Sequence, residues 1–410
     1  MSWAQDIPTW QLVLLSIAGY VYLCRLLRYR RLHQKQALYP YKTREDYAKM
    51  TNQHAYEIQK YLYSVEFPFT TQKALEFALF RTYGIPSISK LLVNTKQLSD
   101  KEFASRRYAD TSILIAEFMA WSPEAERTNA AISRMNYLHS LYQKKNLISN
   151  DDMLYTLSLF AAEPVQWVNR HEWRQMTEME ICAIGTFWKS IGDAMNISYT
   201  DLPSSTHGWR DGLDFYEELH SWSLQYEERA MLPSQYNKKT ADETTALLLY
   251  DVPKSVIPLG RAVVSTLMDD RLRKAMMYPP PPPSIQTGVE TVLTLRKLAL
   301  RYLALPRPHF LRHGIISERA DKNGRYHRTE YESEPWYMES NLRNRWGPQA
   351  WLKWMGGKPI PGTGSFKSQG YLIHEVGPKS QEKMGLKEFE IGKERLMKEG
   401  RGGCPFSVVK

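Results

Sequence analysis

The most constraining feature of this 410-residue chain is an apolar stretch close to its N-terminus. Residues 9–27 read TWQLVLLSIAGYVYLCRLL, and the first charged side chain among them is Arg25. About 18 helical residues without a charge rise far enough to cross most of the hydrocarbon core of a bilayer. The stretch therefore predicts a single transmembrane helix over 9–27.

The charges on either side of this stretch predict how it is inserted. Asp6 alone precedes it, whereas five basic residues lie at or just after its end: Arg25, Arg28, Arg30, Arg31 and Lys35. A cleavable signal peptide would carry its basic residues first, and short flanks rich in Lys and Arg stay in the cytosol. We therefore expect a short lumenal N-terminus at 1–8 and a cytosolic main domain. A buried core helix is the alternative, but it would have to bury the arginine cluster.

The rest of the chain has the apolar spacing of helices. Apolar residues three and four apart recur from 44 to 277 and again at 286–304, with almost no strand-like alternation. Ser149 and Thr177 are suited to cap helices, and Pro123 suits a first helical turn. The sequence therefore predicts an all-α protein.

Three regions are expected after the span. Residues 28–44 form a basic juxtamembrane linker, and 45–305 form a large helical domain, for which 43% hydrophobic residues supply a sizeable core. Five prolines at 279–283 make a stiff connector inside it. Residues 306–410 mix short apolar pieces with Gly, Pro and charge, so we expect an irregular C-terminal segment that wraps the body.

The charge and the cysteine content limit the kinds of partner and the kinds of cross-link that the chain is expected to have. The net charge is +10, but most basic residues are scattered among acidic ones, which favours contact with anionic lipid over nucleic acid. Cys24, Cys182 and Cys404 lie far apart, so we expect neither a disulfide framework nor a Cys-x-x-Cys metal site. No obligate protein partner is evident.

Common catalytic motifs are missing, including His-Glu-x-x-His, Gly-x-Ser-x-Gly, the P-loop and Gly-x-Gly-x-x-Gly. Glu217 and His220 have the spacing of di-iron ligands, but that motif occurs once where such sites need two copies. His309 and His313 are four residues apart, yet the neighbouring prolines and arginines favour a solvated basic segment.

Two polar residues fall on faces that should be buried. His139 shares a helical stripe with Ile132, Met135, Leu138 and Tyr142, so it points into the core as a hydrogen-bonded structural residue or as a ligand. Glu117 interrupts the apolar run 112–119, where it needs an ion pair with Arg134 or Arg107, or a function.

Several segments, in their order along the chain, resemble the MpaB and rubber-oxygenase family over roughly residues 45–350. These segments are FALFRTYGIPSISKLL (77–92), RRYADT (106–111), RMNYLHSLY (134–142), MLYTLSLFAAEPVQW (153–167) and EICAIGTFWKSIGDAMNI (180–197). The fungal ER-bound oxygenases of the MpaB type are more similar still, through the N-terminal span, DDRLRKAM (269–276) and RYHR (325–328).

The resemblance implies a helical domain that holds haem b, binds dioxygen at the open iron position and cleaves an isoprenoid carbon–carbon double bond. For the MpaB type it implies the ER membrane and a prenylated substrate, a farnesylated aromatic meroterpenoid intermediate of mycophenolic acid biosynthesis. An anchored enzyme can collect such a substrate from the bilayer, while haem performs the oxygen chemistry.

The resemblance also suggests site residues. His139 would be the axial ligand, Arg134 a partner of the propionates or the oxygen pocket, and Glu117 a polar group near the distal oxygen. Tyr137 takes the place of the distal lysine of the bacterial enzymes. The remaining cofactor-binding candidates are Arg107 and His327, and the alternative iron ligands are His327 and His171.

His171 is included because rubber oxygenases ligate iron through a histidine near a Trp-Val pair. In this chain Trp167 and Val168 are followed by Asn169 instead, with His171 two residues further on. Two other classes stay open: a noncatalytic lipid- or prenyl-binding helical protein, and a non-haem iron oxygenase that uses His220.

Overall fold

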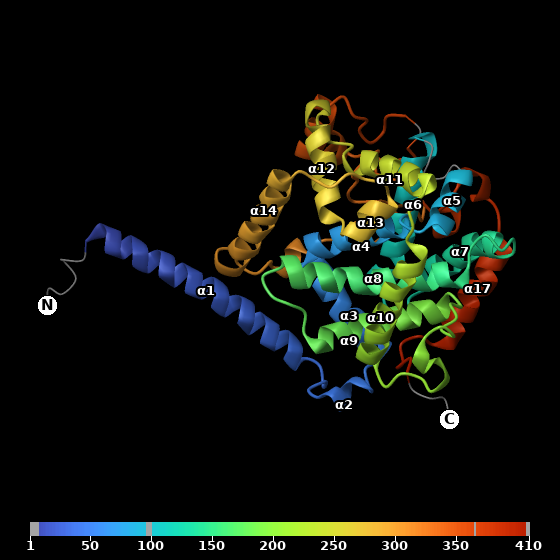
Figure 1. Cartoon of the computed structure of the whole chain (residues 1–410), viewed down its shortest axis with the longest axis horizontal. Helices are drawn as coiled ribbons and strands as arrows, with labels where there is room; N and C mark the ends of the chain where they lie inside the picture. The colour runs from blue at the N-terminus through green and yellow to red at the C-terminus, as the bar shows by residue number, and fades with distance from the viewer. Residues whose placement is uncertain (1–7, 96–100, 365, 407–410) are drawn as a thin grey trace.

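The computed structural model describes residues 8–95, 101–364 and 366–406. Within these residues the chain is helical, and its only β-pairing is three isolated bridges. Figure 1 shows a helical body from which the N-terminal helix projects. The all-α class with one apolar N-terminal helix is therefore confirmed.

The elements have the following bounds: α1 Thr9–Ala37, α2 Arg44–Tyr47, α3 Asn52–Tyr61, the π-helix η1 Leu62–Glu66, α4 Pro68–Thr82, α5 Pro86–Asn94, α6 Lys101–Ala120, α7 Glu126–Gln143, α8 Asn150–His171, α9 Glu178–Ala194, α10 Gly212–Ala230, α11 Gln235–Leu248, α12 Ile257–Leu267, α13 Asp270–Ala275, α14 Pro283–Tyr302, α15 Leu342–Trp346, α16 Pro348–Met355 and α17 Leu386–Glu399. Five short 3₁₀ turns complete the described chain: η2 Pro203–Thr206, η3 Lys254–Val256, η4 His309–Leu311, η5 Ile373–Glu375 and η6 Lys379–Gln381.

Helix α1 is long and apolar enough to cross a membrane, and only 6% of its most apolar 18-residue window is buried in the protein. Apolar side chains such as Leu15 and Tyr22 are exposed all around it, as expected for a helix surrounded by lipid. The helix continues to Ala37, so much of the basic region expected as a linker at 28–44 is helical. Its buried residues are Cys24 and Arg28, which meet the body.

The centre of the body is built by α8 and α9, which pack against α3, α4 and α10. Both helices begin where the sequence predicts. The Ser149 side chain caps α8 by accepting from the Asp152 backbone N–H, and Thr177 and Glu180 form a reciprocal capping box on α9. The body therefore rests on two helices whose starts are fixed locally.

The C-terminal residues cross the surface of this body as turns, bridges and short helices. Tyr326 pairs with Tyr371, and Arg328 pairs with both Ile316 and Met338. Helix α17 then packs on α7. These residues form one wall of the interior described next.

Candidate functional site

Two adjoining cavities lie inside the body. The larger has a volume of about 390 Å³ and is lined by α3, η1, α4, α6 and residues 312–318; we call it the His313 cavity. The smaller, about 230 Å³, is enclosed mainly by α4 to α9, and we call it the His139 cavity. Leu79, Ile115 and Phe160 line both cavities and so form the partition between them.

His139 lies on α7 and lines the smaller cavity together with Arg107 of α6. Its Nδ1 is buried and has no hydrogen-bond partner among the described residues. Burial, and then the positive charge of Arg107, lowers the pKa of His139 to about 4. The imidazole is therefore neutral at physiological pH and has a free nitrogen in apolar surroundings.

These residues fit the haem that the resemblance implies. A neutral imidazole whose nitrogen is not engaged by the protein is the usual axial ligand of haem iron. The walls are mostly apolar, for example Leu114, Met135 and Leu157. Arg107 supplies a cation in the same cavity, as a propionate requires. Elsewhere in the described ranges, no group of three His, Cys, Asp or Glu side chains is arranged to hold a metal ion directly.

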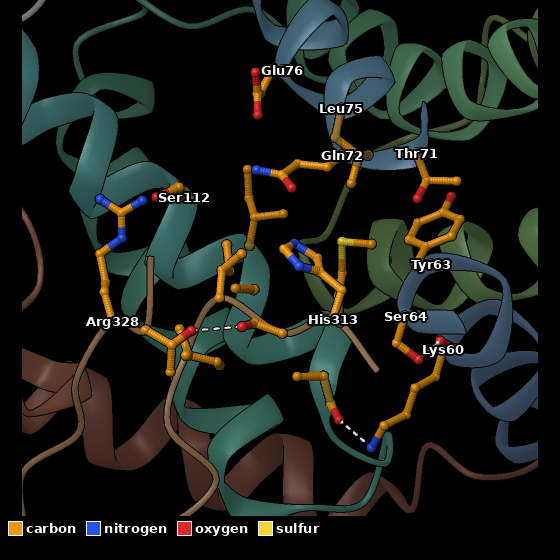
Figure 2. A pocket seen from close by; sticks show the side chains of 18 of the residues that line it. Lys60, Tyr63, Ser64, Thr71, Gln72, Leu75, Glu76, Ser112, His313 and Arg328 are labelled. Atoms are coloured by element: carbon orange, nitrogen blue, oxygen red, sulfur yellow. Dashed lines mark hydrogen bonds between the residues drawn. The ribbon is translucent and has the colours of Figure 1, made fainter. Parts of the chain in front are cut away.

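More polar residues line the His313 cavity than the His139 cavity, and Figure 2 shows the His313 ring pointing toward its middle. The backbone N–H of His313 donates to the Ser64 carbonyl at 2.7 Å, which ties this segment to the π-helix η1. The His313 Nε2 is buried without a partner in the described part of the chain, and its Nδ1 lies 3.6 Å from Glu330 Oε1. This histidine thus also has one unpartnered ring nitrogen and faces a cavity.

The π-helix places Tyr63 in the wall of this cavity. Its hydroxyl and both polar side-chain atoms of Gln59 are buried without hydrogen-bond partners among the described residues. Burial raises the pKa of Tyr63, and the nearby Trp188 indole N–H lowers it by a smaller amount. The Trp188 N–H does not form a hydrogen bond with the Tyr63 hydroxyl. Because buried polar groups are normally paired, these atoms are available to a ligand.

A carboxyl pair lines the opposite side. Lys73 Nζ donates to Glu76 at 2.8 Å and to Glu332 at 2.6 Å, and the Tyr108 hydroxyl donates to Glu332 at 2.7 Å. Burial, followed by the negative charge of Glu332, raises the pKa of Glu76 to about 8. Glu76 is thus protonated at neutral pH and can donate a proton or a hydrogen bond.

Glu117 is fully buried on α6, and its partner is Arg127 rather than the expected Arg134 or Arg107. Arg127 donates to both carboxylate oxygens, at 2.6 and 2.8 Å, and the Tyr371 hydroxyl donates at 2.6 Å. Glu117 does not line either cavity. Its partners hold the C-terminal segment on α6 and α7.

Arg134 is also fully buried, and it donates to the carbonyls of Val376, Gln381 and Met384 at 2.8 to 3.0 Å. Tyr137, one turn later, donates to the Gln381 side chain at 3.2 Å. Neither side chain lines a cavity, although Gln381 does line the His139 cavity. Both residues therefore position the C-terminal segment over that cavity.

The two alternative ligands lie elsewhere. His327 Nε2 lies 3.2 Å from Asp321 Oδ2, so that nitrogen is already paired. His171, at the end of α8, packs its ring against Trp167 and lines neither cavity. Of the site residues expected from the sequence, the structure thus brings His139 and Arg107 together in one cavity and places the others outside both cavities.

Sequence reasoning passed over Glu76, Tyr63 and Gln59, and it expected His313 to be solvated. The signal for Glu76 was present, because a carboxylate inside the run ALEFALF of α4 must be buried. The sequence holds no such signal for Tyr63, Gln59 or His313, because only the π-helix η1 and the segment 312–318 turn these side chains toward the cavity.

The fold and the cavities define a helical protein with one membrane anchor and an enclosed, largely apolar interior. No family model matches the chain. Among curated proteins it is 44% identical over 392 residues to the ER-bound oxygenase mpaB' of Penicillium brevicompactum, covering 95% of this chain and 93% of that protein. It is 41% identical over 346 residues to the ER-bound oxygenase mpaB of the same species, covering 84% and 82%.

The ER-bound oxygenase mpaB of Penicillium roqueforti is 49% identical over 262 residues, which cover 64% of this chain and 88% of that protein. The chain belongs to this family of ER-bound oxygenases. It is thus an oxidoreductase, and α1 is suited to anchor it in the membrane.

Proposed function

We propose that this protein is a haem-dependent oxygenase that cleaves a carbon–carbon double bond in the farnesyl chain of an aromatic meroterpenoid, as in mycophenolic acid biosynthesis. The observation that carries the proposal is the neutral imidazole of His139, with its unpartnered Nδ1, beside Arg107 in an apolar cavity. The family membership supports oxygen chemistry, and the anchor supports a membrane-soluble substrate.

Haem, when bound, would supply dioxygen binding and activation. His139 would hold it through the free ring nitrogen, and Arg107 would pair with a propionate. Because Leu79, Ile115 and Phe160 line both cavities, a haem held by His139 would adjoin the His313 cavity, which has room for an isoprenoid chain. There Glu76, protonated at neutral pH, can donate a hydrogen bond to a carbonyl oxygen of the cleaved product.

We also propose where the enzyme is located in the cell and how it is oriented in the membrane. We place α1 in the ER membrane with residues 1–8 in the lumen and the body in the cytosol, because the basic residues follow the span. The substrate is then a prenylated small molecule dissolved in the same bilayer. The exposed Arg25 and Arg30 would lie at the cytosolic headgroups.

The absorbance spectrum of the purified full chain tests the proposal. We expect a Soret band that is lost in His139→Gly and returns when imidazole is added, since free imidazole can fill the vacated position. His171→Ala and His327→Ala are the matched controls, and both should keep the band. Circular dichroism verifies that each variant is folded.

Other outcomes select other readings. A colourless protein without iron would overturn the oxygenase proposal in favour of a noncatalytic prenyl-binding protein. Iron by elemental analysis without a porphyrin spectrum would select non-haem chemistry. A Soret band that persists in His139→Gly but disappears in His313→Ala would move the ligand to the other cavity.

A further inference from the structure

Helix α14 has an unusual surface, because none of its residues is buried. Its outer face carries large apolar side chains three residues apart: Val292 is 65% exposed, Leu295 is 60% exposed and Leu298 is 45% exposed. The chain continues this surface with exposed Leu303 and Leu305. A contiguous apolar face of this kind on a folded protein normally meets a partner or a membrane.

The position of α14 relative to α1 indicates which of these it meets. The Tyr20 hydroxyl donates to the Leu303 carbonyl at 2.9 Å, the Arg25 guanidinium lies over the Tyr302 ring at 5.7 Å, and Arg28 donates to the Ala304 carbonyl at 2.9 Å. Tyr20 precedes Arg25 by five residues, which is about 7 Å deeper along the span. The end of α14 is therefore level with the last apolar turns of the membrane helix.

Helix α14 also has the orientation of an interfacial helix. Figure 1 shows it lying across the direction of α1, on the side of the body from which α1 projects. On its inner side, Arg296 pairs with Glu172 at 2.9 Å, and Lys297 donates to the Arg170 carbonyl. These bonds hold the polar side of α14 to the body, so the leucine face is turned outward.

The chain after α14 leads from this level to the larger cavity. Arg31 donates to the Arg307 carbonyl. The His309 ring lies 6.1 Å from the Tyr61 ring, and the Lys35 ammonium makes a cation–π contact with the same tyrosine ring. Phe310, 81% exposed, and Leu311 follow, and the next residues line the His313 cavity. The exposed lining residues of the cavity lie on this side: Arg312, Gly314, Glu318 and Thr329.

We propose that the outer face of α14 and the segment Leu303–Leu311 form a second membrane-contacting surface, which holds the mouth of the His313 cavity at the lipid surface. The partner is a phospholipid bilayer with anionic headgroups, because Arg25, Arg30 and Arg307 are exposed beside the apolar face. Lipid is chosen over a second copy of the chain because this surface is continuous with the span and level with it. Delivery of substrate along this route rests on the proposed function, whereas the lipid contact does not.

The test measures depth in the bilayer and needs neither cofactor nor substrate. The full chain, with Cys404→Ser to remove the partly exposed thiol, receives Leu295→Cys or Phe310→Cys and an environment-sensitive fluorophore. It is reconstituted in vesicles of phosphatidylcholine with some phosphatidylserine. The matched control is Ile391→Cys on α17, an apolar residue that is also exposed (58%).

We expect lipids with a nitroxide at the headgroup or the upper acyl chain to quench both labels several-fold more than the label at 391, and aqueous iodide to do the reverse. Iodide quenching at 295 and 310 equal to that at 391 would overturn the proposal. Protection at 295 that appears in detergent only as the protein concentration rises would overturn it too, because that result assigns the face to a second copy. A negative result leaves the spectroscopic test of the oxygenase unaffected, so the two proposals fail separately.

Discussion

Arg134 shows most clearly how the contacts of a residue distinguish a structural role from a chemical one. A buried guanidinium without a carboxylate partner is costly, and here three carbonyls of the C-terminal segment compensate for it. The resemblance suggested that Arg134 binds the cofactor. The geometry instead makes it the clamp that closes the wall of the His139 cavity.

This role gives a prediction at the residue scale. Arg134→Met should lower the free energy of unfolding by about 3 kcal/mol, because buried carbonyls lose charged donors. It should also expose the segment after Val376 to protease. The exposed Arg395→Met on α17 is the matched control and should change stability by less than about 0.5 kcal/mol. Loss of haem from Arg134→Met with an unchanged protease pattern would contradict the clamp and restore the cofactor role.

The sequence predicted which of these residues are buried, but not all of their partners. The apolar stripe around His139 and the apolar run around Glu117 correctly marked residues that face the interior. The partner of Glu117 could not be predicted in the same way, because Tyr371 is 254 positions away along the chain. The helical period tells which side of a helix is buried, but only the tertiary fold decides what meets it.

At the scale of elements, α9 and the start of α10 approach each other closely. A Cβ built on Gly185 would lie 1.9 Å from the Gly212 carbonyl oxygen and 3.1 Å from Tyr216 Cβ. The clash involves backbone, so it cannot be relieved by moving a side chain. The glycine at 185 is therefore what allows the two helices to touch.

Gly185→Ala should force the helices apart and destabilise the protein by more than about 2 kcal/mol. Gly288→Ala is the control, because that glycine lies inside α14 with nothing within 4 Å of its Cβ position. It should stabilise the protein by about 0.5 to 1 kcal/mol through helix propensity. Thermal unfolding in detergent measures both, and equal effects of the two substitutions would show that α9 and α10 do not pack this closely.

Helix boundaries were predictable where the signal is local. Ser149 and Thr177 cap helices at the expected starts. Pro123 did not begin a helix, since α7 starts at Glu126 after a turn. The π-helix η1 was not predictable either, because it depends on how α3 and α4 meet around Phe67.

For the whole molecule, the sequence predicted the anchor, the helical class and a C-terminal segment of different character. It did not predict that helices between α3 and α9 surround two cavities, or that the C-terminal segment supplies part of the walls of both. Gln381 contributes to one cavity and His313 to the other. Such an interior is a product of long-range packing, because the C-terminal segment meets helices that are distant from it in sequence.

Removal of the anchor tests what α1 contributes to the whole molecule. A chain lacking residues 1–27 keeps Arg28 and loses only Cys24 among the buried residues of α1, so we expect it to fold with a melting temperature within a few degrees of the full chain. It should still bind anionic vesicles through α14, but salt should release it, since the remaining attachment is partly electrostatic. Flotation with vesicles at low and high salt measures this.

Under the proposed function, the shortened chain should turn over a short, water-soluble prenyl analogue at the rate of the full chain. Its turnover of a farnesyl substrate dissolved in vesicles should fall about tenfold or more, because the anchor no longer concentrates enzyme and substrate in one membrane. Equal turnover of both substrates by the two proteins would show that α1 only determines location. A selective loss with the membrane-dissolved substrate would show that the anchor takes part in supplying the cavity.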